Sequence, residues 1–184
     1  VLVNNAGIIR DNMIWKMTSE DFDAVMNVNL KGTWLMCREA ARIMKEQNSG
    51  RIINISSRAW LGNAGQSNYS ASKAGVVALS RVLALELGKY NVCVNAVAPG
   101  LIDTPLTQKL PKEVLQKLIE AQPTKTMGKP EDVAKIQEIV DRFEEVRPSG
   151  EQGPTPILKP GEAAQPAHPS PIVGARGEPL ESAK

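Results

Sequence analysis

Apolar and polar residues form long blocks along the chain, and their spacing predicts strands and helices in turn. Three short runs rich in β-branched residues, Val1–Val3, Arg51–Ser56 and Val92–Val97, are typical of buried strands. Between them, apolar residues recur every three or four positions, which predicts helical structure from Thr18 to about Met44 and a long helix from Tyr69 to Leu87. Strands that alternate with long helices favour parallel crossover connections. We therefore expect an α/β fold with a doubly wound parallel sheet.

Residues that start or stop helices refine this pattern. Thr18 or Ser19 can cap the first helical stretch, and Gly32 interrupts it, so either two helical segments or one interrupted helix is expected. Gly88 is expected to close the long helix. Two shorter helices are predicted beyond the third strand, at Glu113–Ala121 and Glu131–Val146, the second opened by a proline.

After Arg147 the composition changes abruptly to Pro, Gly, Ser, Glu and Ala, with few large apolar groups. Such a segment buries too little surface to offset the entropy of ordering it. We therefore predict a folded portion at 1–146 and a disordered tail at 147–184, and we favour a passive extension over an interaction tail.

Charge and composition narrow the classes of function. The 184 residues carry 22 Lys and Arg against 20 Asp and Glu, so no field that would gather nucleic acid or an anionic membrane surface is expected. No run approaches the roughly 20 apolar residues that span a bilayer, and we expect a cytoplasmic protein. The only histidine, His168, lies in the tail, which argues against hydrolases and metal sites that need imidazole in the core. Cys37 and Cys93 lack metal-ligand spacing and are expected to be buried thiols, so no metal is predicted.

Tyr69 and Lys73 are the first candidates for chemistry. At the start of a helix, a phenol and an ammonium four residues apart lie on the same face. A nearby positive charge lowers the pKa of a tyrosine, so we expect Lys73 to bring Tyr69 toward proton exchange near neutral pH. Alone, the pair also fits a surface tyrosine stacked on a lysine stem. Ser57, however, ends a strand at the sheet edge where doubly wound folds place ligands, and it is predicted to join the pair.

Further motifs surround this pair. They are Asn4-Asn5-Ala6-Gly7 after the first strand, Val28-Asn29-Leu30 in the helical stretch, Ser57, Tyr69 with Lys73, and Pro99-Gly100 after the third strand. From Val1 to about Val133 the chain resembles the short-chain dehydrogenase/reductase family, and within it the β-ketoacyl carrier-protein reductases and acetoacetyl-CoA reductases. The resemblance implies a partial Rossmann-like doubly wound parallel sheet, in three α/β/α layers, that lacks the first βαβ units of the family.

The resemblance also implies a role for each matching residue. Tyr69 would donate a proton to a substrate carbonyl as hydride arrives from NADP or NAD in its reduced form, and Ser57 would hold the same oxygen. Lys73 would lower the pKa of Tyr69 and bind the nicotinamide ribose, while Asn29 would anchor a water that connects Lys73 to solvent. The remaining cofactor contacts implied are Asn5, Ala6, Gly7, Pro99, Gly100, Ile102 and Thr104, besides Tyr69 and Lys73.

The implied activity is reduction of a carbonyl to a secondary alcohol, with a β-ketoacyl thioester of acyl carrier protein or CoA as substrate, as in fatty acid biosynthesis. A sugar-alcohol or steroid-like substrate is an alternative, because enzymes that act on them share the catalytic set. An inactive remnant that serves as an interaction or dimerisation module is another, since intact relatives form homo-oligomers through helices that correspond to Leu30–Met44 and Ser72–Leu87. Trp15 and Trp60 are candidates for lining an apolar acyl pocket, with simple packing as the alternative.

The sequence departs from the family pattern in two ways. It lacks the Gly-rich phosphate-binding turn that precedes the Asn-Asn-Ala-Gly motif in relatives, so we expect weak dinucleotide binding and a marginally stable chain with an unpaired apolar edge at Val1–Val3. The stretch before Tyr69 is about one residue shorter than in many relatives, so Ser57 matches by strand position and Ser56 by distance to the tyrosine. We choose Ser57, because neighbouring strand residues point to opposite faces.

Overall fold

The computed structural model describes residues 1–135, which lie within the first of the two units into which the chain divides, Val1–Glu144. The elements in chain order are β1 (Leu2–Asn4), α1 (Ser19–Val25), the π-helical segment η1 (Met26–Gly32), α2 (Thr33–Gln47), β2 (Gly50–Ile55), η2 (Arg58–Leu61), α3 (Ser67–Leu87), η3 (Gly88–Tyr90), β3 (Val92–Val97), η4 (Thr107–Lys109), α4 (Lys112–Glu120) and α5 (Pro130–Ala134). The predicted tail at 147–184 and most of the helix predicted at 131–146 lie outside the described residues.

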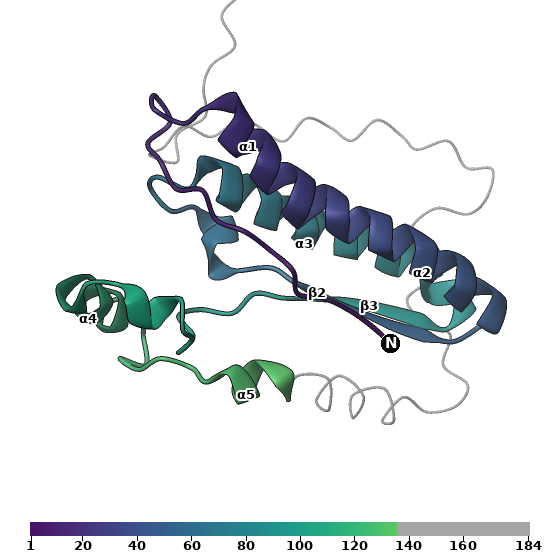
Figure 1. Cartoon of the computed structure of the whole chain (residues 1–184). Coiled ribbons are helices and arrows are strands. Elements are labelled where there is room, and N and C mark those ends of the chain that lie inside the picture. The colour runs from purple at the N-terminus through teal and green to yellow at the C-terminus, as the bar shows by residue number, and fades with distance from the viewer. Residues whose placement is uncertain (136–184) are drawn as a thin grey trace, which may run out of the picture. The chain divides into compact units, whose positions relative to one another are not determined.

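The three strands form one parallel sheet in the order β1-β2-β3, with Leu2 beside Ile52 and Ile52 beside Val94. Each crossover moves the chain one strand in the same direction, and such crossovers are right-handed, so both bring their helices to the same face. Figure 1 shows α1, α2 and α3 together on that face. The predicted α/β class with a parallel sheet is confirmed, and a βαβαβ order of this kind is one half of a Rossmann-like fold.

The core lies between the sheet and helices α2 and α3, and consists of Cys37, Met44, Ile52, Leu87, Val92 and Val94. The central strand β2 is the best covered, with Ile52 fully buried. The first run of the chain differs from its prediction as a buried strand, because Val1 and Val3 are 81% and 54% exposed. Within residues 1–135, β1 is the edge strand and pairs with β2 alone.

The helix boundaries follow the predicted signals with two corrections. Thr18 is the capping residue of α1, and its hydroxyl accepts a hydrogen bond from Asp21 N at 3.1 Å. Gly32 does not break the helix, because the backbone stays helical from α1 through η1 into α2. Gly88 directly follows the last residue of α3, as predicted, but it does not take the left-handed conformation of a closing glycine. The chain continues through η3, and Asn91 takes that conformation with φ 54°.

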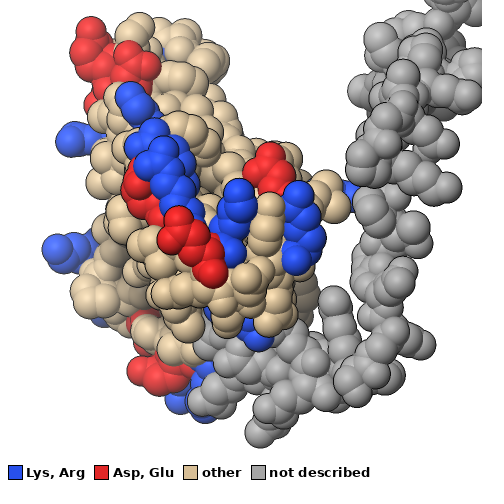
Figure 2. Space-filling model, turned by 90° about the vertical axis from the view of Figure 1, so that its right-hand side faces the viewer, with Lys and Arg blue, Asp and Glu red and all other residues tan. Residues whose placement is uncertain are grey.

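The surface of the described part carries both signs of charge side by side, as Figure 2 shows for one face. On α2, the Glu39 carboxylate forms ion pairs with two arginines, at 2.8 Å from Arg38 Nε and 3.0 Å from Arg42 Nη1. Among residues 1–135, no helix has the length and apolar character to cross a membrane, and no cluster of acidic, Cys or His side chains could hold a metal ion. Cys37 is fully buried, as predicted, whereas Cys93 is only partly buried.

Candidate active site

The carboxyl end of β2 and the start of α3 bring Ser57 and Tyr69 together. Helix α3 begins at Ser67, so Tyr69 lies in its first turn. The Ser57 side chain lies close enough to the Tyr69 phenol to lower the pKa of that phenol by hydrogen bonding. Ser57 also accepts a hydrogen bond from Ala59 N at 3.2 Å, which holds the serine at the start of η2. The two hydroxyls therefore converge on one point at the carboxyl edge of the sheet.

Ser56, the competing serine, has its hydroxyl bonded elsewhere on α3. It is 3% exposed, and its hydroxyl donates to the carbonyl oxygen of Lys73 at 2.9 Å. Ser56 thus ties β2 to α3, while Ser57 faces Tyr69. This geometry supports the choice of Ser57.

Lys73 lies one helical turn after Tyr69 and is almost fully buried. Its ammonium donates to the carbonyl oxygen of Ile55 at 2.7 Å and lies 5.6 Å from the centre of the Tyr69 ring. Burial disfavours a positive charge, so the pKa of Lys73 is lowered from its ordinary value. The lysine is therefore held against the site in an environment that eases loss of its proton.

The pKa of Tyr69 is raised, opposite to the predicted direction. Burial of the phenol is the largest cause, because it disfavours the phenolate. The hydrogen bond from Ser57 acts in the other direction, and the Asp11 carboxylate adds to the rise. Desolvation therefore sets the direction of the Tyr69 pKa, and the lowering by Lys73 that the sequence spacing suggests is not among its causes.

Asn29 lies in η1 and is 1% exposed. Its amide is bonded on both sides to the backbone of Ile8, which donates to Oδ1 at 2.8 Å and accepts from Nδ2 at 3.0 Å. Nδ2 also donates to the Ser72 hydroxyl at 3.2 Å, and Thr33 Oγ1 donates to the Asn29 carbonyl at 2.8 Å. Single π-helical turns inside α-helices are frequent at functional sites. Here the asparagine joins the loop after β1 to α3, while its predicted role as a water anchor stays a prediction.

Gly7 lies directly against the residues of this site. A Cβ at this position would come within 3.3 Å of Asn29 Oδ1 and 3.6 Å of Lys73 Nζ, so a side chain would crowd the site. Asn5 and Ala6, in the same loop, are exposed. The loop therefore leaves an accessible surface above Lys73, as a close-fitting cofactor ribose requires.

The loop after β3 contributes unequally to the site. Arg58 N donates to Pro99 O at 2.9 Å, which places Pro99 beside the residue that follows Ser57. Gly100 lies against Gln122, whose Oε1 would be 3.1 Å from a Cβ there. Two residues of this segment that were predicted to contact the cofactor, Ile102 and Thr104, are bonded to residues further along the chain. Ile102 pairs with Gly128, and Thr104 N donates to Thr107 Oγ1 at 2.8 Å. The predicted cofactor contacts of Ile102 and Thr104 remain predictions.

Two polar residues next to Tyr69 were not recognised in the sequence. Asn68 is fully buried, accepts a hydrogen bond from Tyr69 N at 2.7 Å and donates to Arg10 O at 2.8 Å. Asp11 accepts from Gln66 Nε2 at 2.8 Å and is near enough to affect the Tyr69 pKa. An asparagine in the first turn of a helix is a common capping signal, which could have indicated Asn68. No local pattern indicates Asp11, which lies 58 positions before Tyr69.

Comparison with known proteins identifies the family. Residues 1–115 match the family model described as short chain dehydrogenase. The chain belongs to the short chain dehydrogenase family. Curated short chain dehydrogenases of similar sequence include a (2S)-[(R)-hydroxy(phenyl)methyl]succinyl-CoA dehydrogenase subunit of Thauera aromatica, 51% identical over 134 residues, which are 73% of this chain and 54% of the relative.

Two further curated proteins match this chain over a similar length. A 3-oxoacyl-[acyl-carrier-protein] reductase of Thermotoga maritima is 48% identical over 137 residues, covering 74% of this chain and 56% of the relative. A (3R)-3-hydroxyacyl-CoA dehydrogenase of Homo sapiens is 46% identical over 138 residues, which are 74% of this chain and 53% of the relative. The chain thus spans about half the length of the curated relatives it matches.

Proposed function

We propose that this chain carries the catalytic centre of a nicotinamide-dependent reductase that converts the carbonyl of a β-ketoacyl thioester to a secondary alcohol. The hydrogen bond between Ser57 and Tyr69, beside the buried ammonium of Lys73, is the observation that carries the proposal. The names of the three relatives support the substrate class, because each refers to an acyl group on CoA or acyl carrier protein.

The nicotinamide cofactor would supply the hydride. Ser57 and Tyr69 both offer hydroxyl protons to one carbonyl oxygen, and their hydrogen bonds strengthen as negative charge develops there. Tyr69 then transfers its proton to that oxygen. Lys73, with its lowered pKa, is placed to return a proton toward the phenol side of the site. Asn29 keeps the loop above Lys73 in position through its paired hydrogen bonds to Ile8.

The residues present fit the nicotinamide ribose. Gly7 leaves room directly above Lys73 and Asn29, and Asn5 and Ala6 are open to solvent beside it. In this proposal Lys73 and Tyr69 bind the ribose, and the loop at Pro99 borders the nicotinamide. NADP as the preferred cofactor, NAD as the alternative and a cytoplasmic location rest on family resemblance alone.

The test is turnover of acetoacetyl-CoA with NADPH by the full chain, followed by nicotinamide absorbance. The chain contains two tyrosines, Tyr69 and Tyr90, which offer a matched pair of variants. We expect Tyr69→Phe to lose at least about a hundredfold in rate, as removal of a general acid does, and Tyr90→Phe to stay near the parent. Equal rates in the two variants would refute the assignment. Faster turnover of a sugar alcohol or steroid would overturn the thioester part alone.

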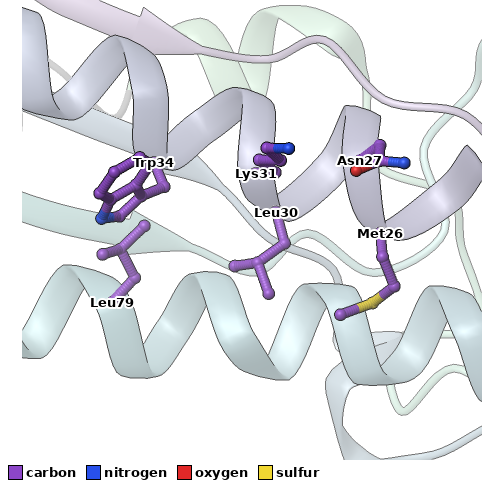
Figure 3. A pocket seen from close by; sticks show the side chains of 6 residues that line it. All are labelled: Met26, Asn27, Leu30, Lys31, Trp34 and Leu79. Atoms are coloured by element: carbon purple, nitrogen blue, oxygen red, sulfur yellow. The ribbon is translucent and has the colours of Figure 1, made fainter. Parts of the chain in front are cut away.

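A second candidate function, self-association, is supported by the outer surface of η1, α2 and α3. Figure 3 shows Met26, Leu30 and Trp34 directed toward α3, where Leu79 points back toward Trp34. These side chains line an open apolar groove of about 380 Å³. Leu85, further along α3, is 78% exposed. Apolar surface of this extent on a soluble domain commonly marks an interface.

Self-association is tested by sedimentation of the full chain. We expect a dimer or larger assembly that Leu85→Glu dissociates, because a carboxylate in an apolar interface is costly to desolvate. Leu61→Glu is the matched control, since Leu61 is similarly exposed but lies on η2. A monomeric parent, or equal effects of the two substitutions, would contradict this function.

A further inference from the structure

A second hollow, separate from the groove between η1, α2 and α3, flanks the turn that carries Tyr69. It has a volume of about 350 Å³ and lies between the loop 12–15 and the loop 62–65. Asn12 N donates to Gly65 O at 2.9 Å, so the two loops are joined where they meet. Ser67 and Ser70, which stand on either side of Tyr69 in α3, complete the lining. The hollow therefore borders the helical turn of the candidate catalytic residue.

Its lining is uncharged and its exposed surface is mostly apolar, with Asn12, Asn63 and two serines as the polar members. Met13, Ile14 and Trp15 contribute large apolar side chains, and no Lys, Arg, Asp or Glu belongs to the lining. Ile14 and Trp15 are 68% and 72% exposed, which leaves their apolar surface without cover within residues 1–135. The absence of charge disfavours a phosphate or nucleotide as occupant and favours hydrocarbon.

Ser70 adds an independent observation. Its hydroxyl is shielded from solvent and has no hydrogen-bond partner among the described residues. Buried polar groups are nearly always paired, so an unpaired one calls for an explanation. A ligand that enters the hollow beside Ser70 could supply the missing partner with one of its oxygens.

We propose that this hollow binds the hydrocarbon chain of the acyl thioester whose carbonyl lies at Tyr69, with the Ser70 hydroxyl bonded to an oxygen of the same ligand. This assignment rests on the proposed function. An apolar cavity of about 150 Å³ is large enough for benzene, so the hollow has room for a chain of several methylenes. The charged nucleotide end of CoA lies outside it. The chain length of the acyl group, rather than its carrier, is then the feature that this hollow recognises.

The experiment is calorimetric titration of the full chain with octanoyl-CoA and with acetyl-CoA, which share the same nucleotide and differ in hydrocarbon. We expect octanoyl-CoA to bind at least about tenfold more tightly, because each buried methylene adds to affinity. Trp15→Ala should abolish most of this preference. Trp60→Ala is the matched control, since Trp60 is 42% exposed on η2 and outside the lining, and it should keep the preference.

A second variant guards against an effect of folding. Ser70→Leu fills the hollow within a helix, where leucine is well tolerated, and should also abolish the preference while the circular dichroism spectrum is retained. Equal affinities of the two thioesters, or a preference that survives both Trp15→Ala and Ser70→Leu, would overturn the assignment. Turnover of acetoacetyl-CoA separates the two levels of the proposal. Reduction without a chain-length preference would support the proposed function and overturn the assignment of the hollow. A chain-length preference without reduction would support the assignment of the hollow and overturn the proposed function.

Discussion

Asn68 offers a sharp quantitative test of how the candidate site is held together. Its side chain joins three segments, because it accepts from Tyr69 N at 2.7 Å and donates to Arg10 O at 2.8 Å and Asp21 O at 3.4 Å. The residue is fully buried, so water cannot replace these partners without local opening. Asn68→Ala would therefore remove the link between the first turn of α3, the loop after β1 and α1.

The magnitude follows from the two short hydrogen bonds. Each contributes about 1 kcal/mol net, and each partly buried backbone group left without a partner adds a desolvation cost of up to about 1 kcal/mol. We expect Asn68→Ala to lower the free energy of unfolding by about 2–4 kcal/mol. That is a large part of the roughly 5–15 kcal/mol typical of a folded domain. Asn63→Ala should cost less than about 0.5 kcal/mol, because Asn63 is exposed and its bond to Gln66 is on the surface.

The assay is urea unfolding of the full chain, followed by far-ultraviolet circular dichroism and analysed for both variants and the parent. Asn63→Ala provides the reference for loss of an asparagine in the neighbouring loop. A cost for Asn68→Ala no greater than that for Asn63→Ala would refute the view that this amide holds the site together.

Three further predictions concern charge and burial near the site. Asp11→Asn should lower the pKa of Tyr69, because the Asp11 carboxylate disfavours the phenolate, and titration of the phenol measures the change. Ser70→Ala should raise the free energy of unfolding by about 1 kcal/mol in urea, since it deletes a buried hydroxyl without a partner, and a loss would count against the Ser70 argument. Lys73→Met should stabilise the fold at neutral pH. The pKa of Lys73 in the folded chain is below the unfolded value of 10.5, so the unfolded chain binds more protons between these two pKa values. The stability of the parent therefore rises as the pH passes from the folded pKa to 10.5. The variant should lack this rise in unfolding measurements across alkaline pH, and an identical pH profile would contradict the cause given.

The strands and the long helix could be predicted because their signals are local. The third predicted strand, Val92–Val97, coincides with β3, and the predicted helix at Tyr69–Leu87 differs from α3 only by an earlier start at Ser67. The π-helical segment could not be predicted from the sequence. It surrounds Asn29, and the amide of Asn29 is hydrogen bonded to Ile8, which lies in a distant loop. Tertiary hydrogen bonds of this kind leave no periodic trace.

The proximity of the candidate site residues could be predicted better than their electrostatics, while their roles stay predictions. Spacing alone places Tyr69 and Lys73 on one face, and the alternation of strand residues separates Ser57 from Ser56. The direction of the Tyr69 pKa depends on how deeply the phenol is buried, which no local pattern specifies. Asp11 likewise acts through the fold, because the loop that carries it is brought to α3 by pairing.

The central claim is that the Ser57 hydroxyl interacts with the Tyr69 phenol and so favours ionisation of the phenol. The most direct measurement is the tyrosinate titration of Tyr69 in a Tyr90→Phe background, where it is the only phenol, with and without Ser57→Ala. The account predicts a higher Tyr69 pKa once the Ser57 hydroxyl is removed. An unchanged or lower pKa would contradict it.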